Sequence, residues 1–585
     1  MSNLFKTAFF HKRLSSLKFI FLTYSLTTCS ILTKKAKSLS SLWKKALGPL
    51  CLLFAFTLQG CGQPSCGQGA IKLPSHEKKI LRLNFSKSLS TFDPRKMGDH
   101  LSSNLGFMLF DGLTNMTKES SHSLALAETI TFNEAKDLYT FTLREAFWSD
   151  GSLIRAEDFV RSWQTIVSQN FPSPSCQLLY PIFGAEKAKK GAFSPGAIGV
   201  KALDERTLEV KLERPTPFFL DLTSFIVLFP LHKSMEKADE IAKENPEAFV
   251  CSGPFRLKLY LPDQEIQLEK NPFYWNQEAV FLDEIHISLV HQDTTAFYMY
   301  QKDQLDLIGF SFSQVPKDAV LSLKKKGELL FKPIAATTLC QFNTLAFPFY
   351  NKNFRKAVAL AINRSEIVEH VTMLGEKIAT SIISPLLKEG REDPFFPDGA
   401  SGEARKYLHI ALDELGCSLE DIEPIPYLYS ISEMNTALAQ AIAGQLSETL
   451  GIVIKPQGCE FKLFLDKLRR RDFMMSQSAW IAQYNDLMNI LERFKDKEGP
   501  TNDPGWENPA YKKLLEESYF CKTKEERFHL LEEAEALFME DLPQVPLFHW
   551  HYPYLQKPYV KGLYVSPIGS VHVTHVDLVK ERKNS

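Results

Sequence analysis

The chain has 585 residues, of which 44% are apolar and 23% are charged. This length is too great for one hydrophobic core, and the composition excludes collagen, a coiled-coil rod and intrinsic disorder as descriptions of the whole chain. Residues 1–60 hold nine Lys and Arg and no Asp or Glu, which leaves 59 basic against 69 acidic residues from Cys61 onward. An acidic body lacks the dense basic face that nucleic-acid binding needs, so we expect no nucleic-acid partner.

The first 60 residues have the pattern of an export signal. Two lysines precede an uncharged, mostly apolar run at 46–60, which is shorter than the roughly 20 residues that a helix needs to cross a bilayer. The run ends at Leu58-Gln59-Gly60-Cys61, which resembles a bacterial lipobox, where the leader is cut before the cysteine and the thiol is acylated. We expect residues 1–60 to be a lipoprotein signal peptide, Cys61 to carry lipid, and residues 61–80 to be a flexible tether. The alternative, a short buried helix beside an unrelated cysteine, fits this position less well.

From Leu81 onward, strand and helix patterns alternate along the chain. Alternating apolar and polar residues predict half-buried strands at 139–143, 208–212, 266–268 and 285–289. Apolar residues at helical spacing over 354–362 predict a helix, and a capping box at 523–526 begins another that ends before Pro543. Because strands and helices are interleaved over the whole length, the predicted fold class is α/β, or mixed α+β.

The common catalytic and metal-binding motifs are absent from the sequence. The sequence has no GxxxxGK[ST], GxGxxG, HExxH or GxSxG motif, and its ten cysteines form no CxxC pair. His549 and His551 would share one face of a strand, but a metal site there would need a third ligand nearby. We therefore expect a binding protein and not an enzyme, with no metal and no other cofactor.

A series of motifs occurs in the same order as in one protein family. They include Tyr139-Thr140-Phe141-Thr142-Leu143-Arg144, Trp148-Ser149-Asp150-Gly151, Ser252-Gly253-Pro254-Phe255, Asn271-Pro272-Phe273-Tyr274-Trp275, Trp480-Ile481-Ala482-Gln483-Tyr484-Asn485-Asp486 and Asp541-Leu542-Pro543. The series resembles the peptide-binding receptors of ABC importers, bacterial extracellular solute-binding protein family 5. The resemblance covers almost everything from Leu81 to the C-terminus.

This resemblance implies a two-lobed periplasmic-binding-protein fold, with an extra subdomain on lobe I, that closes over an extended peptide. It divides the chain into lobe I at 81–110, 230–335 and 552–585, the subdomain at 111–229, and lobe II at 336–551. A chain that crosses between lobes twice makes a hinge, so we expect ligand binding to bring the lobes together.

The resemblance also places the ligand site around Trp480. In oligopeptide binders of this family, an Asp three residues after this Trp holds the α-ammonium of the peptide, and an Arg six residues before that Asp helps to hold the carboxylate. In this chain the two positions are Gln483 and Gln477. Another acidic position of the family corresponds to Gly98, next to Asp99. The predicted ligand-binding residues are Trp480, Gln483, Tyr484, Asn485, Asp99 and Gln477.

The positions that hold the ammonium and the carboxylate of the peptide in those relatives are therefore neutral in this chain, unless Asp99 substitutes for the missing acid. Ligands with blocked or unusual termini, including cell-wall peptides, become more plausible than a plain tripeptide. Two residue assignments stay open. Trp480 either stacks on the ligand or packs in the core, and Arg469, Arg470 and Arg471 either contact a ligand carboxylate or form a solvated basic surface.

The resulting hypothesis is a monomeric, lipid-anchored receptor outside the cytoplasm, which captures oligopeptides or peptide-like ligands and delivers them to ABC permease subunits. One alternative is a receptor of the same fold for a metal chelate or haem, in which His549 and His551 would need a third donor. Another is a surface lipoprotein with a scaffold or adhesion role. A hydrolase is disfavoured because no nucleophile motif is present.

Overall fold

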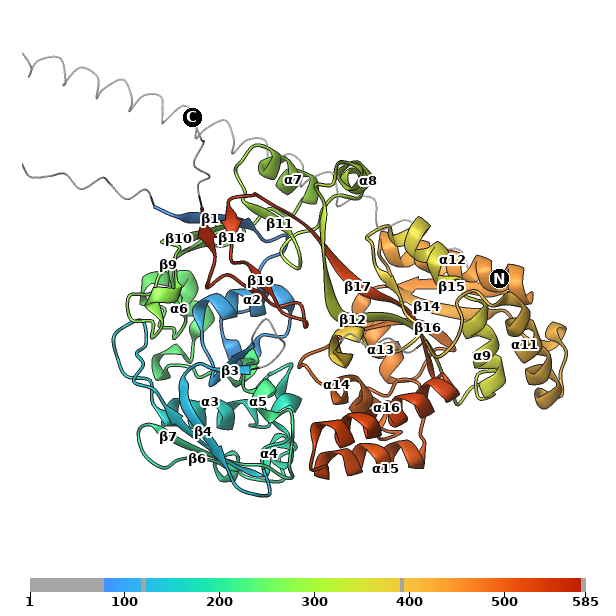
Figure 1. Cartoon of the computed structure of the whole chain (residues 1–585), viewed down its shortest axis with the longest axis horizontal. Helices are drawn as coiled ribbons and strands as arrows, with labels where there is room; N and C mark the ends of the chain where they lie inside the picture. The colour runs from blue at the N-terminus through green and yellow to red at the C-terminus, as the bar shows by residue number, and fades with distance from the viewer. Residues whose placement is uncertain (1–77, 117–121, 390–393, 580–585) are drawn as a thin grey trace, which may run out of the picture. The chain divides into compact units, whose positions relative to one another are not determined.

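The computed structural model describes residues 78–116, 122–389 and 394–579. Strands and helices alternate along this part of the chain (Figure 1), so the mixed α/β fold class is confirmed. The predicted signal peptide, the predicted lipidation site Cys61 and most of the predicted tether lie outside the described residues. The first strand begins at Ile80, the last residue assigned to the tether. Of the helices that the structure describes, none is long and apolar enough to cross a membrane.

The strands are β1 (Ile80–Asn84), β2 (Thr114–Met116), β3 (His122–Leu124), β4 (Ala127–Phe132), β5 (Leu138–Leu143), β6 (Val200–Ala202), β7 (Thr207–Lys211), β8 (Phe255–Leu261), β9 (Glu265–Lys270), β10 (Glu284–Ser288), β11 (Leu307–Gly309), β12 (Leu330–Phe342), β13 (Lys377–Ile378), β14 (Ile425–Ser430), β15 (Ile454–Cys459), β16 (Met475–Ile481), β17 (Gln544–Gln556), β18 (Val560–Lys561), β19 (Tyr564–Val565), β20 (Val571–His572) and β21 (Asp577–Leu578). The α-helices are α2 (His100–Leu109), α3 (Ala156–Ile166), α4 (Ala185–Lys189), α5 (Phe219–Leu222), α6 (Ala238–Glu244), α7 (Asp293–Gln301), α8 (Lys317–Lys326), α9 (Lys352–Ala361), α10 (Arg364–Glu366), α11 (Ser401–Leu415), α12 (Glu433–Leu450), α13 (Phe461–Arg469), α14 (Met488–Leu491), α15 (Pro509–Glu517) and α16 (Lys524–Asp541).

The first sheet has the order β1-β10-β9-β8, in which β1 runs parallel to β10 and the other pairs are antiparallel. Its strands confirm the predicted period of two. Ile285 and Ile287 on β10 are fully buried, and Ile266 and Leu268 on β9 lie opposite them. One face of this sheet is therefore part of the hydrophobic core.

The second sheet has the order β4-β5-β7-β6, and all its pairs are antiparallel. Helix α3 contacts β6 and β7, and the indole of Trp163 on this helix donates to the carbonyl of Leu228 at 2.8 Å. Before α3 the chain turns at Gly151, whose φ of 84° is one that glycine adopts readily. Asp158 in the first turn of α3 accepts hydrogen bonds from Trp148 Nε1 and the Arg155 amide. These motif residues thus stabilise the turn and the helix that follows it.

The third sheet has the order β11-β17-β12-β16-β14-β15, with β13 paired to β17. Strands β12 and β17 are 13 residues long and antiparallel. Their pairing register shifts between Pro333 and Thr337, and Pro333 pairs with His551. The lobe limits expected at 335/336 and 551/552 thus lie close together on the two long strands. These limits remain a prediction.

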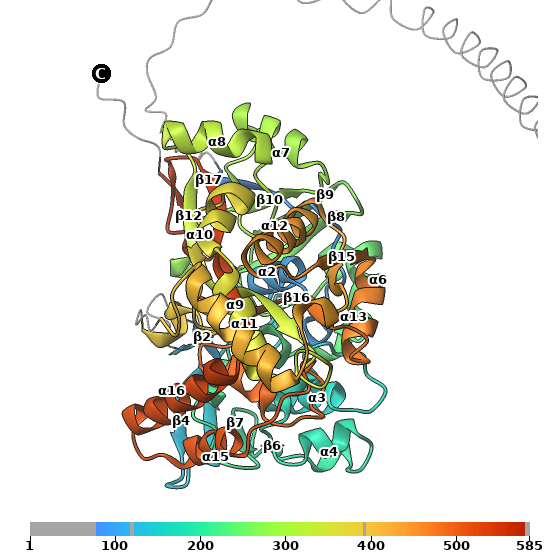
Figure 2. The ribbon, with the colours of Figure 1, turned by 90° about the vertical axis from the view of Figure 1, so that its right-hand side faces the viewer.

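Helices α9 and α11 pack side by side (Figure 2). As the sequence predicts, α9 buries its apolar stripe, which includes Phe354, Ala357 and Val358. Helix α16 begins at its predicted cap, where Thr523 Oγ1 accepts the amide of Glu526 at 3.1 Å. It ends at Asp541, before Pro543. Local sequence patterns therefore determine these helices and their limits.

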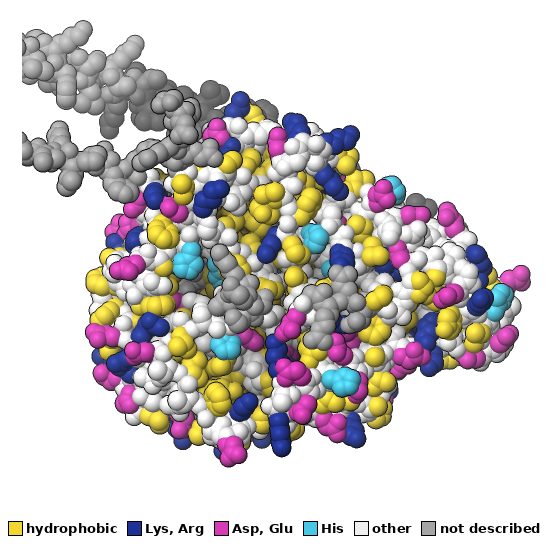
Figure 3. Space-filling view, in the orientation of Figure 1, with side chains coloured by type: hydrophobic (Ala, Val, Ile, Leu, Met, Phe, Trp, Pro, Cys, Tyr) yellow, Lys and Arg dark blue, Asp and Glu magenta, His cyan; other side chains and the backbone are white. Residues whose placement is uncertain are grey.

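Acidic and basic side chains are interspersed on the face of the molecule in Figure 3. This distribution agrees with the 59 basic and 69 acidic residues that the chain contains from Cys61 onward. A face of this kind lacks the strong positive field that attracts nucleic-acid phosphates.

Candidate functional site

Strand β16 has an edge that its neighbour covers only in part. Its pairing with β12 runs the full length, from Met475 opposite Phe342 to Ile481 opposite Ala336. The parallel strand β14 pairs with it only at Met475 and Ser476. No described strand therefore lies beside the second half of β16 on that side, and Ala479 there is exposed.

The direction of the backbone groups along this half of β16 follows from one hydrogen bond. The amide of Ala482 donates to the carbonyl of Ala335 at 2.8 Å, so it points toward β12. Because successive residues of a strand point their amides to opposite sides, the amide and carbonyl of Ala479 and of Ile481 point to the uncovered edge. We call the backbone of residues 477–481 on this side the β16 edge. It can accept an extended chain as a further strand.

Gln477, at the start of this edge, takes part in a neutral side-chain network. Its Nε2 donates to Asn435 Oδ1 at 2.9 Å, and Asn435 Nδ2 donates to the carbonyl of Ser430 at 2.8 Å. The Ser430 carbonyl can only accept a hydrogen bond, so Asn435 turns its Nδ2 toward Ser430 and its Oδ1 toward Gln477. Gln477 Nε2 is therefore the donor to Asn435, and Gln477 Oε1 remains as an acceptor. This oxygen is buried and has no hydrogen-bond partner among the described residues. A carboxylate would thus find no positive charge in this network.

Trp480 points to the opposite face of β16 from Gln477, because side chains alternate along a strand. Its indole donates to Asn489 Oδ1 at 2.7 Å, and the guanidinium of Arg493 lies 4.0 Å from the centre of its ring system. Burial lowers the pKa of Arg493 to about 10. One face of the half-buried Trp480 is thus occupied by an arginine of the same chain. Stacking of its other face on a ligand remains a prediction.

The loop after β16 contacts the segment expected to form the subdomain. Gln177 Nε2 lies 3.5 Å from Gln483 Oε1, and Tyr484 stacks on Phe218 with 4.6 Å between ring centroids. Burial raises the pKa of Tyr484 well above its usual value. Asn485, the next residue, is half-buried. Gln483 and Tyr484, which are predicted to hold ligand, therefore also make contacts within the chain to residues that are far away in the sequence.

The end of this loop is held by an ion pair. The two terminal guanidinium nitrogens of Arg527 on α16, Nη1 and Nη2, donate to the carboxylate of Asp486, at 2.6 and 2.7 Å. Paired hydrogen bonds of this kind fix both distance and orientation. Helix α16 thus positions the loop that carries Gln483 and Tyr484.

Asp99 lies at the start of α2, where its side chain caps the helix. It accepts hydrogen bonds from the Ser102 amide at 2.9 Å and the Ser90 hydroxyl at 2.5 Å. Burial alone would raise the pKa of Asp99, but these hydrogen bonds outweigh burial and lower the pKa. A methyl group added at the adjacent Gly98 would lie 2.7 Å from Pro174, three residues before Gln177. The segment 174–177 therefore extends from the neighbourhood of Asp99 to Gln483.

The three consecutive arginines lie at the C-terminal end of α13, of which Arg469 is the last residue. Arg470 pairs with Asp466 at 3.2 Å, and Arg471 pairs with Glu498 at 3.1 Å. Arg469 is exposed. Their contacts within the chain favour the solvated-surface alternative over a ligand carboxylate.

His549 and His551 lie on β17 and share one face, as expected. Nδ1 of His549 lies 2.9 Å from the Thr337 hydroxyl, and burial lowers the pKa of this histidine to about 3. Within the described ranges, no group of three or more His, Cys, Asp and Glu side chains could hold a metal ion. The third donor that the metal-chelate alternative requires is not found among these residues.

Sequence reasoning missed Gln177, Phe218, Asn435 and Arg493. Arg493 follows another charged residue, Glu492, so its sequence context carried no signal of a role beside Trp480. The other three residues carried none either. Their role depends on partners that are far away in the chain.

Comparisons with known proteins agree with this architecture. The family model described as bacterial extracellular solute-binding proteins, family 5 Middle, matches residues 123–502. The oligopeptide-binding protein OppA of Bacillus subtilis (strain 168) is 32% identical over 531 residues, which are 89% of this chain and 97% of that protein.

Two solved structures have similar folds over nearly their whole length. The Escherichia coli murein tripeptide binding protein MppA has a TM-score of 0.73 at 25% identity, covering 86% of this chain and 99% of that chain. Haemophilus influenzae OppA, in complex with RPPGFSPFR, has a TM-score of 0.70 at 26% identity, again covering 86% and 99%. These similarities confirm the expected two-lobed periplasmic-binding-protein fold.

Proposed function

Since the chain belongs to the bacterial extracellular solute-binding proteins of family 5, we propose that it captures oligopeptides or peptide-like ligands outside the cytoplasm and delivers them to an ABC permease. It acts by binding and catalyses no reaction. The names of its relatives, oligopeptide-binding and murein tripeptide binding protein, support a peptide ligand. They do not distinguish an ordinary peptide from a cell-wall peptide.

The observation that carries the proposal is the β16 edge. Ala479 and Ile481 offer backbone donors and acceptors at a side where β14 no longer pairs. An extended peptide beside them would form main-chain hydrogen bonds like those of an added strand. Such bonds give affinity without a preference for particular side chains, which suits a receptor for many sequences.

The chemistry near this edge favours ligands without the usual charged ends. Gln477 bonds to Asn435, and Gln483 lies beside Gln177, so both positions are occupied by neutral amides. A buried ammonium that has lost its carboxylate partner costs roughly 3–5 kcal/mol. Peptides with a blocked amine avoid that cost, and so do cell-wall peptides that place no free amine at this position.

The anchoring part of the proposal rests on the sequence. Cys61 carries lipid, and residues 61–80 connect it to the folded body, which begins with β1 at Ile80. The tether lets the receptor meet the permease while it stays at the membrane surface. The receptor acts as a monomer.

The test of peptide capture uses backbone N-methylation of the ligand. Native mass spectrometry of the purified protein first identifies the bound mass. In an extended ligand only alternate amides face the β16 edge, so N-methylation of these residues should weaken binding at least about tenfold, whereas methylation of the residues between them should change little. Equal effects at all positions would exclude strand-like binding. A purified protein that carries and accepts no peptide would exclude the proposed function.

A further inference from the structure

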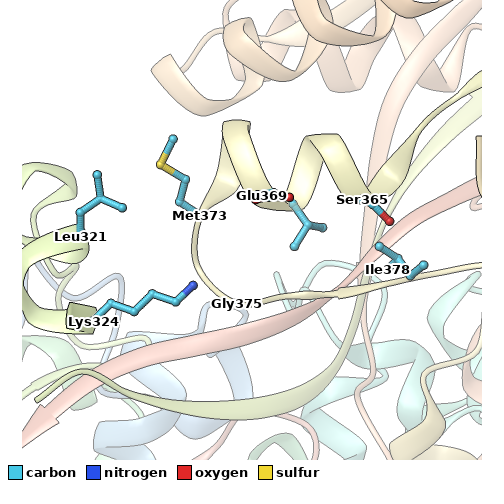
Figure 4. Close-up of a pocket in the computed structure, with 8 residues that line it drawn as sticks. Leu321, Lys324, Ser365, Glu369, Met373, Gly375 and Ile378 are labelled. Carbon is cyan, nitrogen blue, oxygen red and sulfur yellow. The ribbon is translucent and has the colours of Figure 1, made fainter. Parts of the chain in front are cut away.

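A cavity lies away from β16, between α8 and the chain segment 365–378 (Figure 4). Its volume is about 460 Å³. It is lined by Leu321, Lys324, Ser365, Val368, Glu369, Met373, Gly375 and Ile378. Leu321 and Lys324 extend from α8 on one side, and Ser365, Glu369, Met373, Gly375 and Ile378 lie on the segment at the other side. The cavity shares no residue with the β16 edge or with the loop after it.

The wall opposite α8 has an unusual backbone. Helix α10 continues into a π-helical turn, η8 (Ile367–Thr372), which ends at Met373 with a φ of 59°. Single π-helical turns are rare and occur frequently at functional sites, and a non-glycine residue with positive φ is also uncommon. The backbone of this wall therefore departs from a regular helix at the residues that line the cavity.

Hydrogen bonds hold this wall in its conformation. The hydroxyl of Thr372 donates to Glu376 Oε2 at 2.6 Å, and the Leu374 amide donates to the same oxygen at 3.1 Å. Leu374 also packs against the small hydrophobic cluster that includes Val320 and Leu323 of α8. Helix α8 and the segment 365–378, which bound the cavity, thus pack against each other near Leu374.

The polar lining has one group of each charge. Neither Lys324 nor Glu369 lies within 4.0 Å of an oppositely charged group of the described residues. Burial raises the pKa of the Glu376 carboxylate, and the positive charge of Lys324 acts on this group and opposes the rise. The hydroxyl of Ser365 donates to Asp398 Oδ2 at 2.8 Å, so its lone pairs remain able to accept a hydrogen bond. Ser365 lies four residues before Glu369, on the wall opposite Lys324. One wall therefore suits an anionic group, and the other suits a cationic one.

The rest of the lining is apolar. Leu321, Val368, Met373 and Ile378 provide branched and flexible side chains, and Leu321 is 54% exposed. A large aliphatic side chain that is so exposed on α8 would lose contact with water if a ligand covered it.

We propose that this cavity binds a free α-amino acid with an apolar side chain. The carboxylate lies against Lys324, the ammonium against Glu369 and Ser365, and the side chain among Leu321, Val368 and Met373. Each of the three groups of such a molecule has a counterpart in the lining. A fatty acid or an alkylamine would leave one of the two protein charges without a partner.

This site would also bear on the proposed movement of the lobes. Helix α8 precedes the long strand β12 in the chain, and the wall at 365–378 follows it. An amino acid that touches both walls favours the arrangement in which they are close together. If that arrangement differs in its affinity for peptide, the two ligands affect each other's binding equally, as thermodynamic linkage requires.

The test uses leucine as the probe and the whole protein, with isothermal titration calorimetry. Lys324→Glu and Glu369→Lys should each weaken leucine binding at least about tenfold, because each variant places two like charges at one end of the zwitterion. The double reversal K324E/E369K should recover most of the affinity, since the zwitterion can then bind in the opposite orientation. Lys325→Glu, on the same helix but outside the lining, is the matched control and should bind leucine normally.

Three outcomes would overturn the proposal. These are the absence of leucine binding, leucine binding that none of the variants alters, and a double reversal no better than either single variant. Leucine that competes with peptide yet binds equally to the wild type, to both single variants and to the double variant would bind at the β16 edge instead. Peptide binding is measured on the same preparations, so a failure of this proposal is distinguishable from a failure of the peptide-receptor function.

Discussion

Tyr484 stacks on Phe218 with an angle of 13° between the ring planes, although the two residues are far apart in the chain. Close to them, Arg214 lies 3.9 Å from the ring centroid of Tyr519 and pairs with Glu492 at 3.6 Å. Phe218 and Arg214 belong to the expected subdomain, and the other three residues belong to the expected lobe II. These contacts connect the two segments independently of the long strands β12 and β17.

We predict that this aromatic contact stabilises the closed arrangement of the lobes. An offset-stacked pair contributes about 0.5–1.5 kcal/mol beyond its buried area. Tyr484→Ala and Phe218→Ala should each weaken peptide binding and enlarge the radius of gyration of the unliganded protein in small-angle scattering. In a double-mutant cycle on peptide affinity, the coupling should be about 1 kcal/mol.

Phe132→Ala is the control for this experiment, because Phe132 is an aromatic residue of the same segment that is 54% exposed. It should change neither the radius nor the affinity. Additive effects of the Tyr484 and Phe218 substitutions would show that the two rings do not act together. Thermal melting of each variant separates a loss of closure from a loss of folding.

A second prediction concerns the lipid anchor. Cys61→Ser should abolish acylation and release a soluble form, because the hydroxyl does not replace the thiol in lipoprotein processing. Metabolic palmitate labelling and detergent partitioning measure the two effects. Cys66→Ser is the matched control and should stay labelled. Labelling of the Cys61 variant at the wild-type level would rule out the lipobox interpretation.

A third prediction concerns the ligand amine. If the neutral Gln483 has replaced an ammonium-binding acid, N-acetylated peptides should bind within about threefold of their free-amine forms, well below the effect of a broken buried charge pair. Gln483→Asp should restore a preference for the free amine. Calorimetry with matched peptide pairs measures both. A loss of about a hundredfold on acetylation in the wild type would mean that another acid holds the amine.

Asp99 is the acid to examine in that case, and Asp99→Asn is the variant to use. Asparagine keeps a side-chain oxygen for the Ser102 amide, so it preserves most of the helix cap while it removes the charge. If Asp99 holds the amine, the Asp99→Asn substitution by itself should lower the affinity for free-amine peptides. If it serves only as a cap, peptide affinity should stay unchanged.

A fourth prediction follows from the lowered pKa of Asp99. The charged form is favoured in the folded protein, so it adds stability relative to the Asn variant above the unfolded-state pKa of about 3.9. This advantage should disappear as the pH falls through the lower, folded-state pKa. Urea unfolding of both proteins across the acid range measures it. Asp99→Ala should cost about 0.5–2 kcal/mol at neutral pH, because it removes the cap itself.

Elements that depend only on neighbours in the chain could be predicted from local sequence patterns. The period-two segments at 139–143 and 285–289 became β5 and β10, and the capping box at Thr523 began α16. In each case the local pattern of apolar residues decides which side faces the core, and the cap satisfies amides only a few residues away. The motif series was also sufficient to indicate the family, which the comparisons confirm.

The surroundings of the predicted site residues, by contrast, depend on packing between distant parts of the chain. Alternation along β16 puts Gln477 and Trp480 on opposite faces, but the point at which β14 stops pairing depends on how the whole sheet assembles. Likewise, nothing near Tyr484 in the sequence indicates Phe218 as its partner. Strand neighbours and contacts between distant segments arise from packing over long chain separations, whereas periodicity and capping act within a few residues.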